Sequence, residues 1–235
     1  MRRDSSDETG TLSGLESLSL WWDIEISDFN ALDSLTSLRT LDLRDLRRSK
    51  SSGLGVLDLD KLAHLTRLES LKLGGTSGFH GSFVSLSALT SLRKLDLNET
   101  SDIDRIDWLS TLQNLEELYL AGNNTRDIRS LSTLNKLQTL VLDSTGVGDI
   151  SVLRNFPLLE TLILKHTPVV DIAPLADLRQ LKTLDLSHTS IARIDALSGL
   201  SNLRVLNLAS FKFRVGNVGG SRAGVSPAQR TLEAP

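Results

Sequence analysis

The sequence has 235 residues, and its 26 basic and 29 acidic side chains give a formal net charge of −3 at pH 7. This balance is too acidic for a chain whose main task is to hold a phosphate backbone, so we expect no nucleic-acid partner. The sequence contains no cysteine, which excludes disulfides, thiolate metal sites and cysteine nucleophiles.

Leucine accounts for 49 residues, about a fifth of the chain, whereas aromatic residues make up only 4%. The core must therefore be aliphatic. No run approaches the ~18 uninterrupted apolar residues that a membrane-spanning helix needs, so we expect no membrane insertion.

Residues 1–14 form a short polar segment that begins MRRDSSDETG. Its two arginines are followed by acidic residues and serines rather than by an apolar stretch, so no secretory signal pattern is present. We therefore expect a cytoplasmic protein.

The pattern L-x-x-L-x-L then occurs nine times within residues 15–213. Its first leucines are Leu15, Leu38, Leu68, Leu92, Leu115, Leu137, Leu159, Leu181 and Leu203. The last five starts are 22 residues apart, and units such as LQTLVLDSTGVGDI and LETLILKHTPVVDI nearly superimpose. A fixed period of this length indicates a repeat array, in which each unit packs against its neighbours.

Within each unit, the last two leucines stand two residues apart, so both point to one face of a short strand. We expect Leu140 and Leu142 to face the core, and Thr139 and Val141 to face outward. Stacked units would share an aliphatic core and pair their strands in parallel. A unit of 22 residues leaves no room for a full α-helix on the return path. The sequence therefore predicts an α/β repeat solenoid.

These units resemble leucine-rich repeats of the 22-residue kind, L-x-x-L-x-L-x-x-N/T-x-I-x-D-I-x-x-L-x-x-L, which occurs in bacterial internalins and in the leucine-rich regulator of protein phosphatase 1. The resemblance covers residue 15 to about residue 213. It implies a curved solenoid with a parallel β-sheet on the concave face and 3₁₀ or irregular turns on the convex face.

The resemblance also implies a role for the ninth position of each unit, which is usually asparagine. The position holds Thr76, Thr100, Asn123, Thr145, Thr167 and Thr189. In the family this side chain bonds backbone groups inside the turn and forms a ladder. A threonine hydroxyl can make part of the same contacts.

The first units depart from the regular spacing. Residues 44–56, RDLRRSKSSGLGV, read as an insertion of about seven or eight residues between the second and third strands. Its basic residues suit either contact with an acidic partner or a solvated loop. They are Arg44, Arg47, Arg48 and Lys50.

Trp21 and Trp22 follow the first strand. We expect one of the two rings to shield the open N-terminal end of the core. Tryptophan is enriched at interfaces, so Trp22 is also a candidate binding residue.

Residues 214–235 contain one leucine and several Gly, Ser and Pro, so we expect a disordered tail. Neither end of the array shows a polar capping unit, which leaves exposed core and an unpaired strand edge. Phe211 and Phe213 could plug this end. Otherwise the chain is part of a larger protein, or the uncapped end associates with another chain.

The outward strand residues should form columns on the concave face, about 4.8 Å apart from unit to unit. One column places Tyr119, Val141 and Ile163 side by side as an apolar patch. The polar residues around it are Glu117, Asp143, Lys165, His166, Asp185 and His188. An apolar patch with a polar rim is the anatomy of a protein-binding hot spot, although β-branched and aromatic residues also simply suit strands.

His166 and His188 occupy equivalent positions in successive units, so they should be neighbours. Two histidines with loose carboxylates, but without a third fixed ligand, are weak grounds for a metal site, and we predict no metal and no cofactor. The pair could instead make binding pH-sensitive.

Motifs for a serine nucleophile, a phosphate loop and a zinc protease are all missing from the sequence. An open solenoid also offers no enclosed pocket, so we expect no enzymatic activity. We expect a non-catalytic module that binds a protein or peptide on its concave face, as a regulatory scaffold. The alternatives are a host-directed or surface recognition protein similar to internalins, and a sensor fragment of a larger signalling protein.

Overall fold

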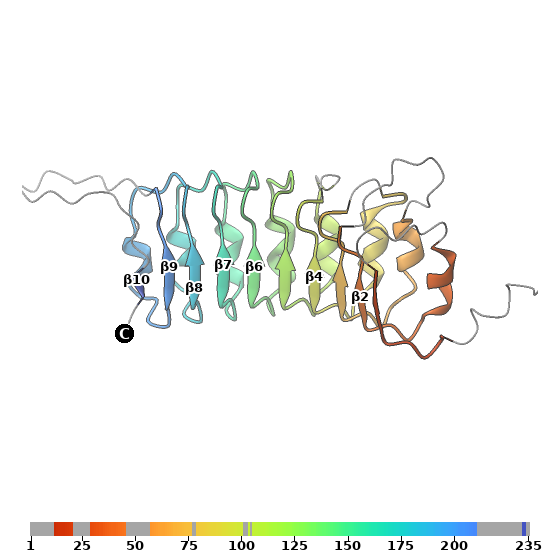
Figure 1. Cartoon of the computed structure of the whole chain (residues 1–235). Coiled ribbons are helices and arrows are strands. Elements are labelled where there is room, and N and C mark those ends of the chain that lie inside the picture. The colour runs from red at the N-terminus through yellow and green to blue at the C-terminus, as the bar shows by residue number, and fades with distance from the viewer. Residues whose placement is uncertain are drawn as a thin grey trace, which may run out of the picture.

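The computed structural model describes residues 12–20, 29–45, 57–76, 79–100, 103, 105–210 and 232–233. Over these residues the chain is a curved solenoid whose coils stack side by side, with a continuous sheet on one face and short helical turns on the other (Figure 1). The predicted repeat solenoid is therefore confirmed.

The sheet contains ten strands among the described residues, and each strand pairs with the next one along the chain. They are β1 (Ser17–Ser19), β2 (Thr40–Asp42), β3 (Ser70–Lys72), β4 (Lys94–Asp96), β5 (Glu117–Tyr119), β6 (Thr139–Val141), β7 (Thr161–Ile163), β8 (Thr183–Asp185), β9 (Val205–Asn207) and β10 (Leu232–Glu233). The strands β1 to β9 run parallel, and β10 pairs antiparallel with β9.

Each parallel strand has a leucine at its centre, and the residues on either side face the concave surface. In β6, Leu140 is fully buried, whereas Thr139 and Val141 are half-buried. Leu142, one residue beyond the strand, is again fully buried. The period-two prediction for this unit is therefore confirmed.

The return path of each coil is a 3₁₀ helix of three to six residues, as the short repeat predicts. Among the described residues these are η2 (Asn30–Ser34), η3 (Leu59–Leu62), η4 (Phe83–Ala88), η5 (Asp107–Thr111), η6 (Arg129–Thr133), η7 (Ser151–Asn155), η8 (Ala173–Leu175) and η9 (Asp195–Leu197). In the part of the chain that the structure describes, no helix has the length and apolar character needed to cross a membrane.

The buried ninth-position side chains bond carbonyl groups inside the turns in two ways. Thr145 donates its hydroxyl to the Leu142 carbonyl of its own coil at 2.6 Å. Asn123 instead reaches the preceding coil and donates to the Leu97 carbonyl at 2.9 Å. Thr76 does the same toward an earlier coil. The expected ladder therefore links coils at Thr76 and Asn123, whereas Thr145, Thr167 and Thr189 close their own turns.

One residue per coil, directly before the ninth position, adopts a left-handed backbone conformation with φ between 54° and 72°. These residues are Asp45, Gly75, Glu99, Gly122, Ser144, His166, His188 and Ser210. From Asp45 to His188 their N–H groups donate to a carbonyl of the next coil, as His166 does to Ser187 at 3.0 Å. The turn therefore extends the inter-coil ladder beyond the strands.

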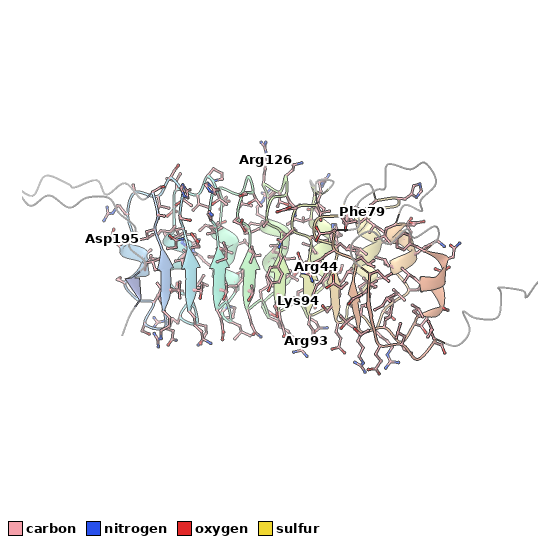
Figure 2. The ribbon with its side chains drawn as sticks, viewed as in Figure 1. Arg44, Phe79, Arg93, Lys94, Arg126 and Asp195 are labelled. Carbon is pink, nitrogen blue, oxygen red and sulfur yellow. The ribbon has the colours of Figure 1, made fainter. Side chains whose placement is uncertain are left out.

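Opposite charges pair across neighbouring coils just before the strands. These exposed pairs are Arg39 with Glu69, Arg93 with Glu116, and Lys182 with Glu160. Arg93 is labelled at this edge in Figure 2. Each exposed ion pair contributes little to stability by itself, but all three favour the observed pairing of neighbouring coils.

Several sequence expectations fall outside the described residues. These are most of the insertion predicted at 44–56, the tryptophan Trp22, and the segment 211–231 that includes the two candidate plugging phenylalanines. Within the tail that we expected to be disordered, the structure places β10, which pairs with the β9 edge that we expected to be open. For the other residues of this tail, which lie outside the described residues, the expectation stays a prediction.

Candidate functional site on the concave face

Three outward-facing residues of the middle strands form an apolar row across the sheet. The register pairs Tyr119 with Val141, Val141 with Ile163, and Ile163 with Asp185. All four side chains are half-buried, so each presents part of its surface to solvent. The predicted adjacency is confirmed, and we call Tyr119, Val141 and Ile163 the apolar row.

A row of threonines runs beside the apolar row, on the other side of the central leucines. Thr139, Thr161 and Thr183 are aligned by the same register and are half-buried. Within the described part of the chain, their hydroxyl groups have no hydrogen-bond partner. These threonines are absent from the sequence-predicted site, although a threonine at the first position of β6, β7 and β8 is visible in the sequence.

Tyr119 also belongs to a cluster of polar contacts at the N-terminal end of the apolar row. Its phenol donates to Glu117 Oε2 at 2.7 Å. Lys94 pairs with the same carboxylate, and its ammonium lies 5.0 Å from the centroid of the Tyr119 ring. A cation at this distance is attracted by the ring face. Lys94, labelled in Figure 2, was missing from the sequence-predicted site.

These contacts shift the pKa values of all three groups. Burial alone would raise the pKa of the Glu117 carboxyl, but the hydrogen bonds from Lys94 and Tyr119 outweigh it and lower the pKa below 4.5. Burial and the bond to Glu117 raise the pKa of the Tyr119 phenol. Burial would lower the pKa of Lys94, but the Glu117 carboxylate raises it overall. At neutral pH the cluster is therefore an ion pair bonded to a neutral phenol.

A second ion cluster lies on β2 and β3. Asp42 is only 5% exposed, and it accepts hydrogen bonds from Arg44 Nε at 3.0 Å and Arg44 Nη2 at 2.9 Å. Lys72 Nζ lies 3.1 Å from the same carboxylate. Burial would raise the pKa of Asp42, but these cations lower it below 3.8.

This geometry corrects the interpretation of Arg44. The sequence pattern groups Arg44, which is labelled in Figure 2, with the cations of an inserted loop. Its side chain is instead held at the end of β2 by Asp42, two residues earlier. The ion pair between Arg44 and Asp42 therefore belongs to the end of strand β2 rather than to the inserted loop.

Fewer internal contacts engage the polar residues at the C-terminal end of the apolar row. Asp185 accepts the backbone N–H of Ser187 at 2.8 Å and the Asn207 amide at 2.9 Å. Asp143 and Lys165 lie just beyond their strands and are half-buried. Their side chains make no ion pair or hydrogen bond within the described residues.

The predicted neighbours His166 and His188 stack on one another. Their ring centroids are 4.2 Å apart and the ring planes differ by 18°. The Nδ1 atom of His188 also lies 3.1 Å from the Ser210 hydroxyl. Among the described residues, no group of three or more His, Asp or Glu side chains is arranged to hold a metal ion.

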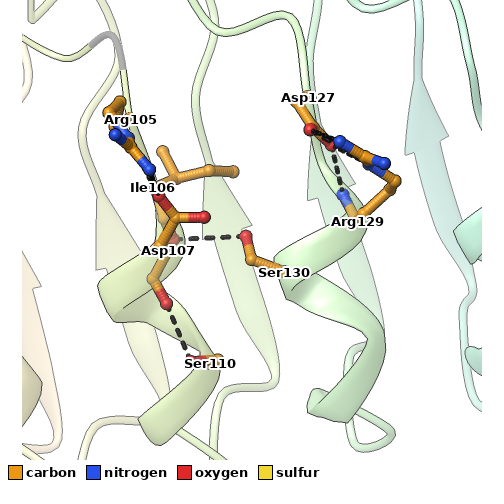
Figure 3. A network of polar contacts seen from close by, with 7 residues as sticks. All are labelled: Arg105, Ile106, Asp107, Ser110, Asp127, Arg129 and Ser130. Carbon is orange, nitrogen blue, oxygen red and sulfur yellow. Dashed lines mark hydrogen bonds and ion pairs between the residues drawn. The ribbon is translucent and has the colours of Figure 1, made fainter.

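The polar side chains near the 3₁₀ helices form contacts within their own coil or with the neighbouring coil (Figure 3). Asp127 accepts the backbone N–H of Arg129 at 2.9 Å, and the guanidinium of Arg129 lowers the pKa of Asp127 to about 2. Ser130 donates its hydroxyl to the Ile106 carbonyl of the preceding coil at 3.4 Å. These side chains are therefore engaged in turn formation, unlike the threonines on the concave face.

Comparison with known proteins agrees with this architecture. The family model for leucine-rich repeats in two copies matches residues 113–155 and 179–217. No curated protein matches the chain at a significant level.

Solved structures give a longer match. An internalin (inlF) from Listeria monocytogenes superposes with a TM-score of 0.73 and 25% identity, over 87% of this chain and 58% of that chain. Internalin C2 (inlC2) from the same organism gives 0.71 and 28%, over 86% of this chain and 84% of that chain. The Arabidopsis receptor kinase HAESA, solved in complex with the peptide hormone IDA and the co-receptor SERK1, gives 0.69 at 21% identity, over 84% and 34%; this likeness concerns the fold alone.

The chain thus has the fold of a leucine-rich repeat solenoid, and residues 113–155 and 179–217 match the family model. More particularly, it resembles the internalins, and it spans 58% of the length of the inlF chain.

Proposed function

We propose that this chain is a non-catalytic module that binds a protein or peptide partner on its concave face, with the apolar row as the anchor. The observation that carries the proposal is the contrast along this face. On β2 to β5, Lys72 is paired with Asp42 and Lys94 with Glu117, whereas the apolar row and the threonine hydroxyls lie open to a partner.

The energetic argument favours the middle of the sheet. A partner that covers the apolar row removes aliphatic and aromatic surface from water, which contributes about 25 cal/mol per Å². The neighbouring threonine hydroxyls can donate to and accept from the backbone or polar side chains of the partner. A partner docking on β2 or β3 would instead have to compete with the bonds that Asp42 already makes.

The scaffold is suited to such binding because it is already ordered. Every strand from β1 to β9 is fixed by its neighbours, and the left-handed turns extend the ladder past the strand ends. Little backbone entropy is then lost on docking, so more of the contact energy is available as affinity.

Affinity purification with mass spectrometry tests the proposal. Ile163→Asp places a charge in the centre of the apolar row, and Tyr119→Ala removes the ring at its end. Val170→Asp is the matched control, because Val170 is 62% exposed on the outer turn and lies outside the concave face. We expect the first two variants to lose a partner that the wild type and the control both retain. Recovery of the same proteins by all four baits would refute the choice of surface.

For the cellular role we propose a regulatory scaffold in the cytoplasm, because the stacked strands present one preformed binding surface. The second candidate, a surface or host-directed recognition protein, is favoured by the likeness to two internalins. Cell fractionation combined with protease treatment of intact cells separates the two. Protection from the protease supports the scaffold, and digestion supports surface recognition.

A further inference from the structure

Three rows of half-buried side chains cross β6 and β7 side by side on the concave face. They are the threonines Thr139 and Thr161, the apolar row with Val141 and Ile163, and the charged residues Asp143 and Lys165. The bond from the Ser144 N–H to the Lys165 carbonyl keeps the third row aligned beyond the strand ends. Neighbouring rows lie two residues apart along the chain, so the outer rows are about 13 Å apart, close to the ~10–12 Å diameter of an α-helix with its side chains. A partner on the apolar row is therefore flanked by hydroxyls on one side and by charges on the other.

The spacing along the apolar row suits the repeat of an α-helix. Neighbouring strands lie about 4.8 Å apart, so the row advances about 9.6 Å from Tyr119 to Ile163. A helix rises about 1.5 Å per residue, so positions i, i+3 or i+4, and i+7 on one of its faces span about 10.5 Å. Positions i, i+2 and i+4 of an extended chain span about 13 Å. A helix lying along the row therefore places one apolar residue on each coil, whereas an extended chain loses the match within three coils.

The apolar row also favours a partner whose backbone is already hydrogen-bonded. A helix bonds its own N–H and carbonyl groups internally, apart from those at its ends. An extended segment on the face of the sheet would bring unpaired backbone groups onto Val141 and Ile163, and burying such groups without a partner costs free energy. The strands beneath cannot supply these bonds, because their own N–H and carbonyl groups are engaged with neighbouring strands. The threonine hydroxyls flank the row on one side only.

The third row defines the charges that one flank of such a helix would need. The side chains of Asp143 and Lys165 make no ion pair or hydrogen bond within the described residues. Both are half-buried already, so a partner that covers them must supply opposite charges or bury them unpaired. One coil separates the two, which corresponds to three or four residues of a helix.

We propose that the concave face binds an amphipathic α-helix of a protein partner, lying along the apolar row across β5 to β7. Apolar residues at i, i+3 or i+4, and i+7 of this helix contact Tyr119, Val141 and Ile163. One flank carries a basic residue opposite Asp143 and an acidic residue opposite Lys165, and the other carries polar side chains that bond the threonine hydroxyls. This inference rests on the proposed function and specifies the chemistry of the partner.

Selection from two display libraries tests the proposal. The first library varies the exposed face of one helix in a small folded helical scaffold, and the second displays linear peptides without a fixed structure. The bait is the full chain, and clones that also bind its Ile163→Asp variant are removed. We expect binders from the first library that carry apolar residues at i, i+3 or i+4, and i+7. We also expect a basic and an acidic residue three or four positions apart on one flank.

An exchange of charges tests the third row. The double variant Asp143→Lys with Lys165→Asp keeps the net charge but reverses the two positions. We expect the selected helices to bind it roughly tenfold more weakly than wild type, and helices with exchanged charges to regain the affinity. The matched control exchanges an ion pair outside the three rows, Glu160→Lys with Lys182→Glu, and should leave the affinity unchanged. Fluorescence anisotropy measures the affinities, and far-ultraviolet circular dichroism shows that each variant is folded.

The possible results separate this inference from the proposed function. Binders that depend on Ile163 but whose apolar residues alternate, or helical binders that are insensitive to the charge exchange, would overturn the inference and leave the proposed function standing. If neither library yields a binder that depends on Ile163, both are overturned.

Discussion

Replacing Ser144 with glycine should stabilise the protein, even though the substitution removes a side chain. Ser144 has a φ of 58°, and its N–H donates to the Lys165 carbonyl at 2.8 Å, a bond that glycine retains. A residue with a Cβ atom in this conformation costs about 1–2 kcal/mol. Glycine loses more conformational entropy on folding than serine does, and this loss offsets about 0.5–1 kcal/mol of the strain that is relieved. The net expectation is a stabilisation of about 0.5–1 kcal/mol.

The mirror substitution provides the control. Gly122 occupies the same turn position one coil earlier, with a φ of 69°. A Cβ atom added there would lie 3.3 Å from Glu99 Cγ, the middle of a flexible side chain, so the backbone conformation dominates the effect. Gly122→Ser should therefore destabilise by about the same 0.5–1 kcal/mol.

Urea unfolding followed by circular dichroism measures both variants. We expect the midpoint to rise for Ser144→Gly, to fall for Gly122→Ser, and to return close to wild type in the double variant. A lower midpoint for Ser144→Gly, or a shift of both single variants in the same direction, would refute the argument that backbone strain governs this position.

The remaining predictions concern the core and the ion clusters. Leu140→Ala should cost about 2–5 kcal/mol because Leu140 is fully buried, whereas the equivalent Leu206→Ala should cost less, since Leu206 is only partly buried; urea titrations at low protein concentration compare the two. Asp42→Asn should lose about 1–2 kcal/mol at pH 7, because it breaks bonds to two partly exposed cations. The pKa of Asp42 is lowered on folding, so its contribution is complete well above pH 3.8 and is lost as the pH falls through 3.8 toward the folded value. The stability gap between wild type and Asp42→Asn should therefore narrow between pH 6 and pH 3, and a constant gap would argue against the charge. Tyr119→Phe should raise the pKa of Glu117 by removing a hydrogen bond to its carboxylate, which a carboxyl-carbon NMR titration measures directly; an unchanged pKa would exclude the bond as a cause.

The fold could be predicted from the sequence because one local rule repeats. The two-residue spacing of leucines sets the inward face of every strand, and the 22-residue step places equivalent residues of neighbouring coils in register. That rule alone brings Tyr119, Val141 and Ile163 together, and it also makes His166 and His188 neighbours. Properties that follow from the repeat were therefore accessible without a structure.

Contacts that depend on side-chain reach were not accessible in the same way. Lys94 contacts the Tyr119 ring because it occupies the neighbouring column one coil earlier, where a long side chain can cross between rows. Arg44 folds back on Asp42, although its sequence neighbours suggested a loop of free cations. The antiparallel pairing of β10 has no periodic signal at all. In each case the missing information is three-dimensional direction rather than residue type.

The apolar row and the Lys94–Glu117–Tyr119 cluster would contribute differently to affinity and specificity. On the proposed function, a partner would gain most of its binding energy where apolar surface is covered and no internal bond is broken, which is the apolar row from Val141 to Ile163. At the β5 end, the Glu117 carboxylate already has two donors, so an additional charge brought by a partner would meet a satisfied ion pair. A charge that is buried here without an oppositely charged neighbour costs free energy. The cluster would therefore weaken the binding of ligands with a misplaced charge more than it would strengthen the binding of the correct ligand. The row would therefore provide the affinity, and the Lys94–Glu117–Tyr119 cluster would limit which partners can use it.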